Sequence, residues 1–276
     1  MLHRTRFENE IASLREYEEA VTTARAQTHY LPIDLNNRLK GKKVGAHVPA
    51  AAATAKVVDV IVYFHGVIGV CGSESKFIAQ GIDYLWSNAP FDKMRSELDA
   101  SGRAALLIVP RLDSRVGKTG TTSDHYGNLH EEKAFDKLIR KCCDGLVALK
   151  AIRADVKLGN IVLAAHSGGG SPMYAILGAK NDLRPKIRAC WGFECLYPGM
   201  QTWFDWLNED PLLRFRHFRQ EGFYWRRAHA LRDGTSKRFI DSTRLKDPTA
   251  HCRLIRDFWK TAIDHMPKSA GANAAF

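Results

Sequence analysis

A serine lies between a histidine and three glycines in the stretch Asn160–Ile176, which reads NIVLAAHSGGGSPMYAI. An apolar run precedes Ser167 and a helix-like segment follows it, a pattern typical of a sharp strand-to-helix turn that exposes a nucleophile. Such a turn needs small residues two positions to either side, and Ala165 and Gly169 are small. A serine that only capped a helix would not need this glycine run. The pattern predicts a nucleophilic Ser167, with N–H groups of the following helix directed at an oxyanion.

A second motif lies about a hundred residues upstream, where the apolar run VVDVIVYF is followed by a His-Gly pair that ends at Gly66. The two motifs, in this order, resemble the α/β-hydrolase family from about residue 57 to residue 251. The family pattern G-x-S-x-G has alanine in place of its first glycine here, which adds only a methyl group. The resemblance implies an oxyanion hole in which an amide near Gly66 or Val67 is paired with the amide of Gly168.

The general base is expected toward the C-terminal end, because the chain order in this family is serine, acid, histidine. His251 is the predicted base, since it follows a proline in a short loop and directly precedes an amphipathic helix. His229 remains the alternative on position alone. His217 falls inside a predicted strand and His265 lies close to a predicted tail, so neither is preferred.

The acid is predicted to be one of two glutamates. Glu194 lies in CWGFECLY, at the carboxyl end of the fourth recognised strand, where aromatic neighbours could shield an ion pair. Glu221 follows the next strand, from which more members of the family take their acid. Either carboxylate could hold the neutral imidazole in the right tautomer and stabilise it once it is protonated. We favour Glu194 and keep Glu221 as the alternative.

Four further residues are predicted to line a substrate pocket, namely His65, Trp191, Tyr197 and Trp203. The aromatic-rich segment after strand 6 of the fold would then be a cap over the nucleophile, and its rings would hold an acyl or aryl group. The same aromatics could instead be packing residues, and His65 could instead shape the oxyanion turn. His166 is interpreted as a packing residue.

No metal ion or organic cofactor is expected. The stretch GKTGTT lacks the glycine that a phosphate loop needs five positions upstream, because Leu112 stands there. His125 and His130 have no third ligand at metal spacing.

Alternating apolar runs and helical periodicities predict an α/β fold, with a mainly parallel sheet covered by helices on both faces. The predicted strands are Val57–Gly66, Arg103–Leu112, NIVLAAHS, KIRACWGFECLY and RFRHFRQ, and the predicted helices are Phe7 to about Thr28, Phe91–Ala100, LHEEKAFDKLIRKCCDGLVALKAI and SPMYAILGAK, with AAATAK as a connecting loop. Residues 1–56 are expected to pack, as a helix and leading strands, on a core at 57–267, and 268–276 to form a flexible tail. The ligand site belongs at the carboxyl ends of the strands.

The bulk composition sets further expectations. With 276 residues, 45% of them hydrophobic, the chain suits one large domain. Neither a signal peptide nor a membrane-spanning run is recognised, so we expect a cytoplasmic location and six reduced cysteines. The net charge of +11 is concentrated in Arg38–Lys43 and Arg214–Arg232, which favours anionic partners.

These observations predict a serine hydrolase that cleaves a carboxylic ester, of a small molecule or a polymer, through an acyl-enzyme. An amidase or peptidase would use the same triad. A non-catalytic protein of this fold, which binds an anionic partner or nucleic acid through its basic face, is the alternative from another class. Nucleic acid is the less favoured partner, and no membrane partner is expected.

Overall fold

The computed structural model describes residues 28–35, 44–67, 71–87, 91–112, 129, 131–195, 200–210, 212–220, 239–245 and 250–268. The predicted helix that begins at Phe7, the chain beyond residue 268, and the candidates Tyr197, Glu221 and His229 lie outside these residues. Within the described ranges, no helix has the length and apolar character needed to span a membrane.

The described strands form one eight-stranded sheet in the order β1-β2-β4-β3-β5-β6-β7-β8. The pairs β1–β2 and β2–β4 are antiparallel, and all other pairs are parallel. The strands are β1 (Thr28–Leu31), β2 (Val44–His47), β3 (Val57–Phe64), β4 (Ala105–Pro110), β5 (Lys157–His166), β6 (Ile187–Phe193), β7 (Arg214–Gln220) and β8 (Phe239–Leu245). The five predicted strands are β3 to β7, so these predictions are confirmed.

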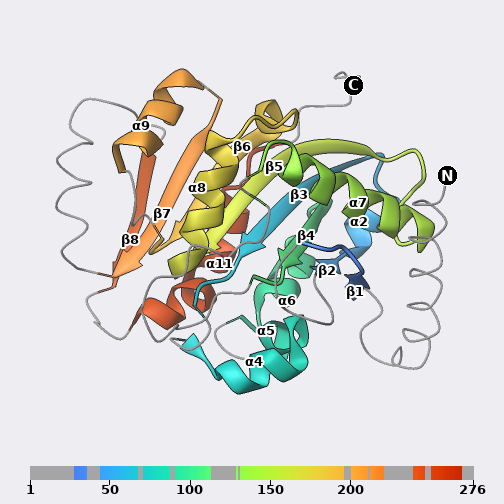
Figure 1. The fold of residues 1–276 in the computed structure, drawn as a ribbon, viewed down its shortest axis with the longest axis horizontal. Helices are drawn as coiled ribbons and strands as arrows, with labels where there is room; N and C mark the ends of the chain where they lie inside the picture. The colour runs from blue at the N-terminus through green and yellow to red at the C-terminus, as the bar shows by residue number, and fades with distance from the viewer. Residues whose placement is uncertain are drawn as a thin grey trace.

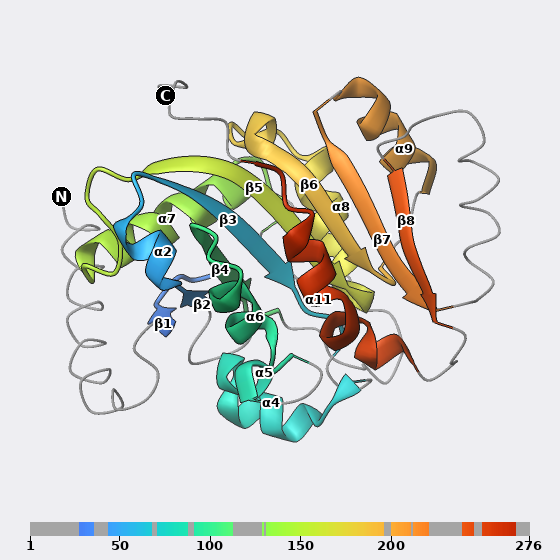
Figure 2. The ribbon, with the colours of Figure 1, turned by 180° about the vertical axis from the view of Figure 1, so that it is seen from behind.

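Helices cover both faces of this sheet (Figures 1 and 2). One face carries α4, α5, α6 and α11, and the other carries α7, α8 and α9. The helices are α2 (Ala50–Thr54), α4 (Glu74–Gln80), α5 (Ile82–Ser87), α6 (Met94–Ala100), α7 (Ala134–Ala148), α8 (Gly170–Gly178), α9 (Met200–Glu209) and α11 (Leu254–Asp264), with short 3-10 turns η1 (Ser167–Gly169), η2 (Arg184–Lys186) and η3 (Ala250–Arg253). The predicted α/β fold, with a mainly parallel sheet covered by helices on both faces, is confirmed.

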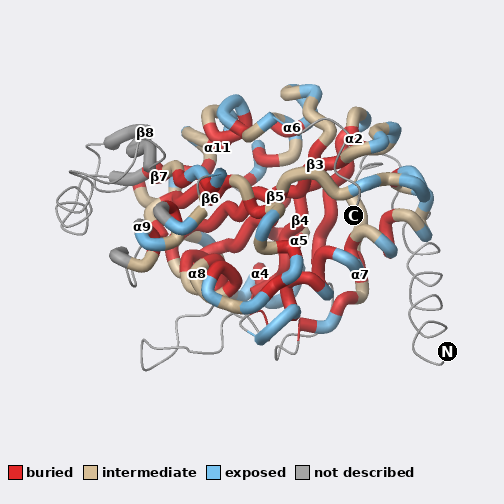
Figure 3. The backbone as a smooth tube through the Cα atoms, turned by 90° about the horizontal axis from the view of Figure 1, so that it is seen from above, coloured by how far each residue is buried: buried red, intermediate tan, exposed pale blue. Residues whose placement is uncertain are grey.

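The central strands β3 and β4 are buried, which accounts for their apolar sequences. β3 is buried from Val58 to Phe64, and β4 is buried along its whole length. Parallel strands covered on both faces read as continuous apolar runs, which is why these two strands could be located in the sequence. The burial view shows these strands as the interior of the molecule, between two cores that lie on opposite faces of the sheet (Figure 3).

Three elements differ from the sequence expectations. AAATAK is not a loop, since Ala50–Thr54 forms the short helix α2 directly after Pro49, and alanine has the highest helix propensity. β8 was not predicted, because FIDSTRL lacks a continuous apolar run. The segment expected as a cap contains α9, whose Trp203 and Leu207 are buried in a sheet core. α9 is therefore a helix that packs on the sheet.

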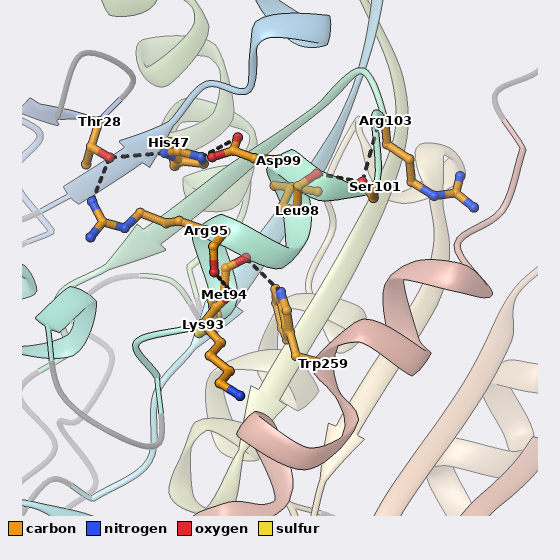
Figure 4. A network of polar contacts seen from close by, with 11 residues as sticks. Thr28, His47, Lys93, Met94, Arg95, Leu98, Asp99, Ser101, Arg103 and Trp259 are labelled. Atoms are coloured by element: carbon orange, nitrogen blue, oxygen red, sulfur yellow. Dashed lines mark hydrogen bonds and ion pairs between the residues drawn. The ribbon is translucent and has the colours of Figure 1, made fainter. Parts of the chain in front are cut away.

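The helix α6 is fastened to the antiparallel edge of the sheet by a chain of polar contacts (Figure 4). His47 Nε2 lies 3.0 Å from Asp99 Oδ1, and His47 Nδ1 lies 3.1 Å from Thr28 Oγ1. Arg95 Nη1 donates to the same threonine oxygen over 2.9 Å. These contacts join β1, β2 and α6.

Candidate active site

Ser167 lies where β5 ends and the 3-10 turn η1 begins, directly before α8. Its φ is +50°, in the left-handed region that non-glycine residues rarely adopt. Strained backbone of this kind persists where the surrounding structure enforces it, and it is common at active sites. The strand-to-helix turn predicted around this serine is therefore present, with the serine in its strained position.

The glycines after Ser167 are required by close approaches of the backbone. A Cβ on Gly169 would lie 2.1 Å from the carbonyl oxygen of Phe64, at the end of β3. A Cβ on Gly170 would lie 2.0 Å from the carbonyl oxygen of Cys195, just after β6. The glycines thus let the start of α8 press against the ends of both neighbouring strands.

His251 and Glu194 are brought together from positions 57 residues apart. His251 lies on η3, before α11, and its Nδ1 is 2.8 Å from Glu194 Oε2. The carboxylate can only accept, so Nδ1 carries the hydrogen and Nε2 remains available to accept a proton. Glu194 also has a left-handed backbone, with φ +48°, at the carboxyl end of β6. Both side chains keep about a fifth of their surface exposed.

His166 connects the serine to the histidine loop. Its Nε2 lies 2.9 Å from the carbonyl oxygen of His251, and the two rings are 4.7 Å apart between centroids. The buried ring has a pKa lowered to about 3, mainly by desolvation and then by the nearby His251. It is therefore neutral, and its Nε2–H donates to the carbonyl. The residue before Ser167 thus fixes the backbone of His251.

The turn at Gly66 lies directly against the serine. A Cβ on Gly66 would lie 2.7 Å from the Cβ of Ser167, so this position also requires glycine. His65 holds the turn in place, since its Nδ1–H donates to the carbonyl of Gly66 over 2.9 Å and its Nε2 accepts from the N–H of Leu112 over 2.9 Å. Burial lowers the pKa of His65 to about 4, which keeps it neutral. This geometry supports the turn-shaping interpretation of His65, because its side chain is fully buried.

The cysteines correct one expectation. Cys71 and Cys252 form a disulfide, although they are 181 residues apart, whereas all six cysteines were expected to be reduced. The other four are free thiols. No local spacing pattern marks this pair, because the fold alone brings the start of the α4 region to η3. Cys252 directly follows His251, so the disulfide ties η3 to the segment that follows β3.

One group of donors in the described residues has the spacing of a metal site. Atoms of Cys71, His166 and His251 lie within 4.8 Å of one another. The sulfur belongs to the disulfide, and each histidine has one ring nitrogen in a hydrogen bond already described. The disulfide and these hydrogen bonds therefore account for the cluster.

The remaining candidates fall into two groups. Trp191 and Trp203 are each 1% exposed and belong to the two cores, so their rings pack rather than form an open surface at Ser167. Val67 is half-buried beside Gly66.

Two features of the site were not predicted from the sequence: the hydrogen bond from His166 to His251 and the disulfide. The signal in the sequence was that His166 is adjacent to Ser167 and Cys252 is adjacent to His251.

Comparisons with known proteins add the following. No protein-family model matches the chain, and no curated protein sequence matches it. Solved structures with a similar fold include a siderophore hydrolase from Aspergillus nidulans (11% identity, covering 87% of this chain and 96% of that chain, TM-score 0.43), a histone deacetylase from Saccharomyces cerevisiae (13%, 94% and 96%, 0.40) and an esterase B from Lactobacillus rhamnosis (10%, 94% and 96%, 0.39). Their activities differ and the likeness is distant, so the chemistry must be argued from the site.

Proposed function

We propose that this protein is a serine hydrolase that cleaves a carboxylic ester through an acyl-enzyme. Ser167 is the nucleophile, His251 the general base and Glu194 the acid that orients it. The observation that carries the proposal is the 2.8 Å contact between His251 Nδ1 and Glu194 Oε2, on a turn tethered to the residue before a serine at φ +50°.

The proposed chemistry uses these three side chains. Ser167 Oγ attacks the ester carbonyl while His251 Nε2 takes its proton, and Glu194 stabilises the imidazolium that forms. The imidazolium then protonates the departing alcohol, which leaves an acyl group on the serine oxygen. Water, deprotonated by His251, attacks the acyl carbon, and the carboxylic acid leaves as the serine regains its proton. Each step balances without a cofactor.

The oxyanion is assigned to the amides of Gly168 and Val67. Gly168 directly follows the serine, and Gly66 lies against it. In a trans peptide the carbonyl and the next N–H point in opposite directions, so the bond that holds the Gly66 carbonyl on His65 turns the N–H of Val67 away from that ring. Loss of one such donor typically costs about 3 kcal/mol of barrier.

The test combines labelling with turnover. A fluorophosphonate probe should modify Ser167, located by mass spectrometry, and p-nitrophenyl butyrate should be hydrolysed. Ser167→Ala should abolish labelling and lower kcat by at least about 10⁴-fold, with circular dichroism as the control for folding. A folded wild-type protein that is neither labelled nor active would overturn the proposal.

The same assay separates ester from amide cleavage. The proposal expects the p-nitrophenyl ester to be turned over much faster than the p-nitroanilide of the same acyl group. Equal or faster cleavage of the anilide would instead assign the protein to the amidases. An anionic ester, such as a p-nitrophenyl hemisuccinate, tests whether the basic charge of the chain favours negatively charged substrates.

A further inference from the structure

Four side chains meet at the disulfide between Cys71 and Cys252, which joins the segment after β3 to η3. Donor atoms of Cys71, His166 and His251 lie within 4.8 Å of one another, and the sulfur of Cys252 is bonded to that of Cys71. While the disulfide is closed, neither sulfur can bind a metal ion as a thiolate. Reduction brings two thiols and two imidazoles together, which is a donor set typical of structural zinc sites.

The second nitrogen of each imidazole is already held as it is in metal sites. A histidine that binds a metal usually donates its other ring N–H to a carboxylate or a backbone carbonyl, which fixes the tautomer and the ring orientation. His251 Nδ1 donates to Glu194 Oε2 over 2.8 Å, and His166 Nε2 donates to the carbonyl oxygen of His251 over 2.9 Å. These bonds leave Nε2 of His251 and Nδ1 of His166 as the nitrogens that can bind an ion.

The free nitrogen of His166 is an independent indication of a ligand. The side chain of His166 is 1% exposed, and its Nδ1 has no hydrogen-bond partner among the described residues. Nearly all buried polar atoms in folded proteins have a partner, and an ion or a water fills that role where the protein itself does not. A metal ion bound at Nδ1 would satisfy this lone pair.

The distances and charges suit zinc. With Zn–S bonds of about 2.3 Å and Zn–N bonds of about 2.0–2.1 Å, the ligand atoms around a tetrahedral ion are about 3.3–3.8 Å apart. The donors of Cys71, His166 and His251 therefore need to approach by about 1 Å. Two thiolates balance the two positive charges of the ion, so no net charge is buried with it. Cys71 and His251 are half-buried, which leaves the ion a route from solvent.

We propose that reduction of the disulfide between Cys71 and Cys252 creates a zinc site, in which both thiolates, Nδ1 of His166 and Nε2 of His251 bind one Zn²⁺ ion. With the ion on Nε2, His251 cannot take the proton of Ser167, so zinc switches off hydrolysis. This inhibition rests on the proposed esterase function, whereas the binding of zinc does not.

The reaction needs a reductant, which is a dithiol or a phosphine. Each cysteine sulfur gains one electron and one proton as the S–S bond breaks. The dithiol supplies the protons and becomes a disulfide, or the phosphine becomes a phosphine oxide with the oxygen of a water molecule that supplies them. Zn²⁺ then displaces the two thiol protons and keeps its oxidation state.

The experiment compares the full chain before and after reduction with a phosphine, which is then removed under argon by gel filtration. Calorimetry should show that one Zn²⁺ ion binds to each reduced chain at least about a hundredfold more tightly than to the oxidised chain. Co²⁺ in place of zinc should give a thiolate-to-cobalt charge-transfer band with the reduced chain alone. This band reports sulfur ligands directly.

Two variants locate the site. Cys71→Ala/Cys252→Ala should lose tight zinc binding and the cobalt band, whereas Cys143→Ser, which removes a half-buried free thiol from α7, should keep both. If the double variant does not fold, His166→Asn replaces it. That variant keeps both thiols and should bind zinc at least about tenfold more weakly.

Turnover separates this inference from the esterase proposal. Zinc should abolish hydrolysis of p-nitrophenyl butyrate by the reduced chain, a chelator should restore it, and Ser167→Ala should bind zinc as the wild type does. Three results would overturn the zinc site: no zinc binding to the folded reduced chain, equal binding before and after reduction, or equal binding by Cys71→Ala/Cys252→Ala. Tight zinc binding that leaves turnover unchanged would overturn the assignment of His251 as a ligand.

Discussion

Two histidine–carboxylate pairs lie in different regions of this molecule. His251 is 2.8 Å from Glu194, and His47 is 3.0 Å from Asp99. The second pair also has a hydroxyl, because Thr28 Oγ1 lies 3.1 Å from the other ring nitrogen of His47 (Figure 4). By side-chain contacts alone, the region of His47 is a complete hydroxyl, imidazole and carboxylate relay.

The two regions differ in backbone conformation and in the contacts made by the hydroxyl-bearing residue. Thr28 lies on an extended strand, and its oxygen accepts from Arg95. Ser167 and Glu194 instead both have positive φ, at the carboxyl ends of the adjacent strands β5 and β6. Strain of this kind costs about 1–3 kcal/mol per residue. Strained backbone thus marks the region of Ser167 and Glu194, whereas the contacts of His47 hold the regular elements β1, β2 and α6 together.

The largest expected difference between the two regions is in turnover. Glu194→Gln should lower kcat by about 10³ to 10⁴-fold, because the imidazole loses the partner that fixes its tautomer and stabilises its charge. Asp99→Asn, the matched change in the other pair, should leave kcat unchanged. The measurement is hydrolysis of p-nitrophenyl butyrate. Equal losses in the two variants would contradict the distinction.

The disulfide is the next largest difference, since only the His251 region has one among the described residues. Reduction with dithiothreitol should lower the free energy of unfolding by about 2–4 kcal/mol and also lower kcat, because His251 is next to Cys252. Chemical unfolding with and without the reductant measures this effect. The control is Cys71→Ala/Cys252→Ala, which should not respond to the reductant. A response of the same size in that variant would place the sensitive sulfur elsewhere.

The buried histidines make the stability of the fold sensitive to acid. His65 and His166 have native pKa values of about 4 and about 3, whereas an unfolded histidine has a pKa of about 6.5. The unfolded state therefore binds protons that the native state does not. The free energy of unfolding should be level above about pH 6.5 and fall by about 1.4 kcal/mol per pH unit for each histidine as the pH drops toward 4.

Urea unfolding between pH 7.5 and pH 4.5 measures this slope. His166→Asn should reduce the slope of the unfolding free energy against pH by the contribution of one histidine. The pKa of His47 is also lowered by burial, but its bond and charge interaction with Asp99 oppose that shift. His47→Asn should therefore change the slope less than His166→Asn does, and the reverse order would contradict the assigned burial effects.

The smallest expected effects are those of the His166 and His47 variants on kcat, which distinguish a residue that positions His251 from one that only stabilises the fold. His166→Asn removes the bond to the carbonyl of His251, which is worth about 1 kcal/mol, and should lower kcat about fivefold with little change in KM. His47→Asn should cost a similar stability but leave kcat unchanged. Steady-state kinetics and thermal unfolding of both variants make the test. A fall in kcat for His47→Asn that equals the fall for His166→Asn would remove the positioning role.

Much of the central architecture could be predicted from the sequence. The apolar runs located β3 to β6, because parallel strands buried on both faces keep no polar alternation. The turn around Ser167 could also be predicted, since the need for small residues at a sharp strand-to-helix turn is local. The position of His251, directly before the amphipathic α11, was likewise a local pattern. Short helices such as α2 and the polar β8 could not be predicted, because their composition does not distinguish them from loops.

The tertiary structure alone decided which distant groups meet. Glu194, rather than some other carboxylate, contacts His251 because the register of β6 beside β5 places its end next to the serine turn. The pairing of Cys71 with Cys252 depends on the same packing of helices and strands. Periodicity determines which face a residue occupies, but contacts between segments a hundred residues apart are fixed only when the strands pair and the helices pack.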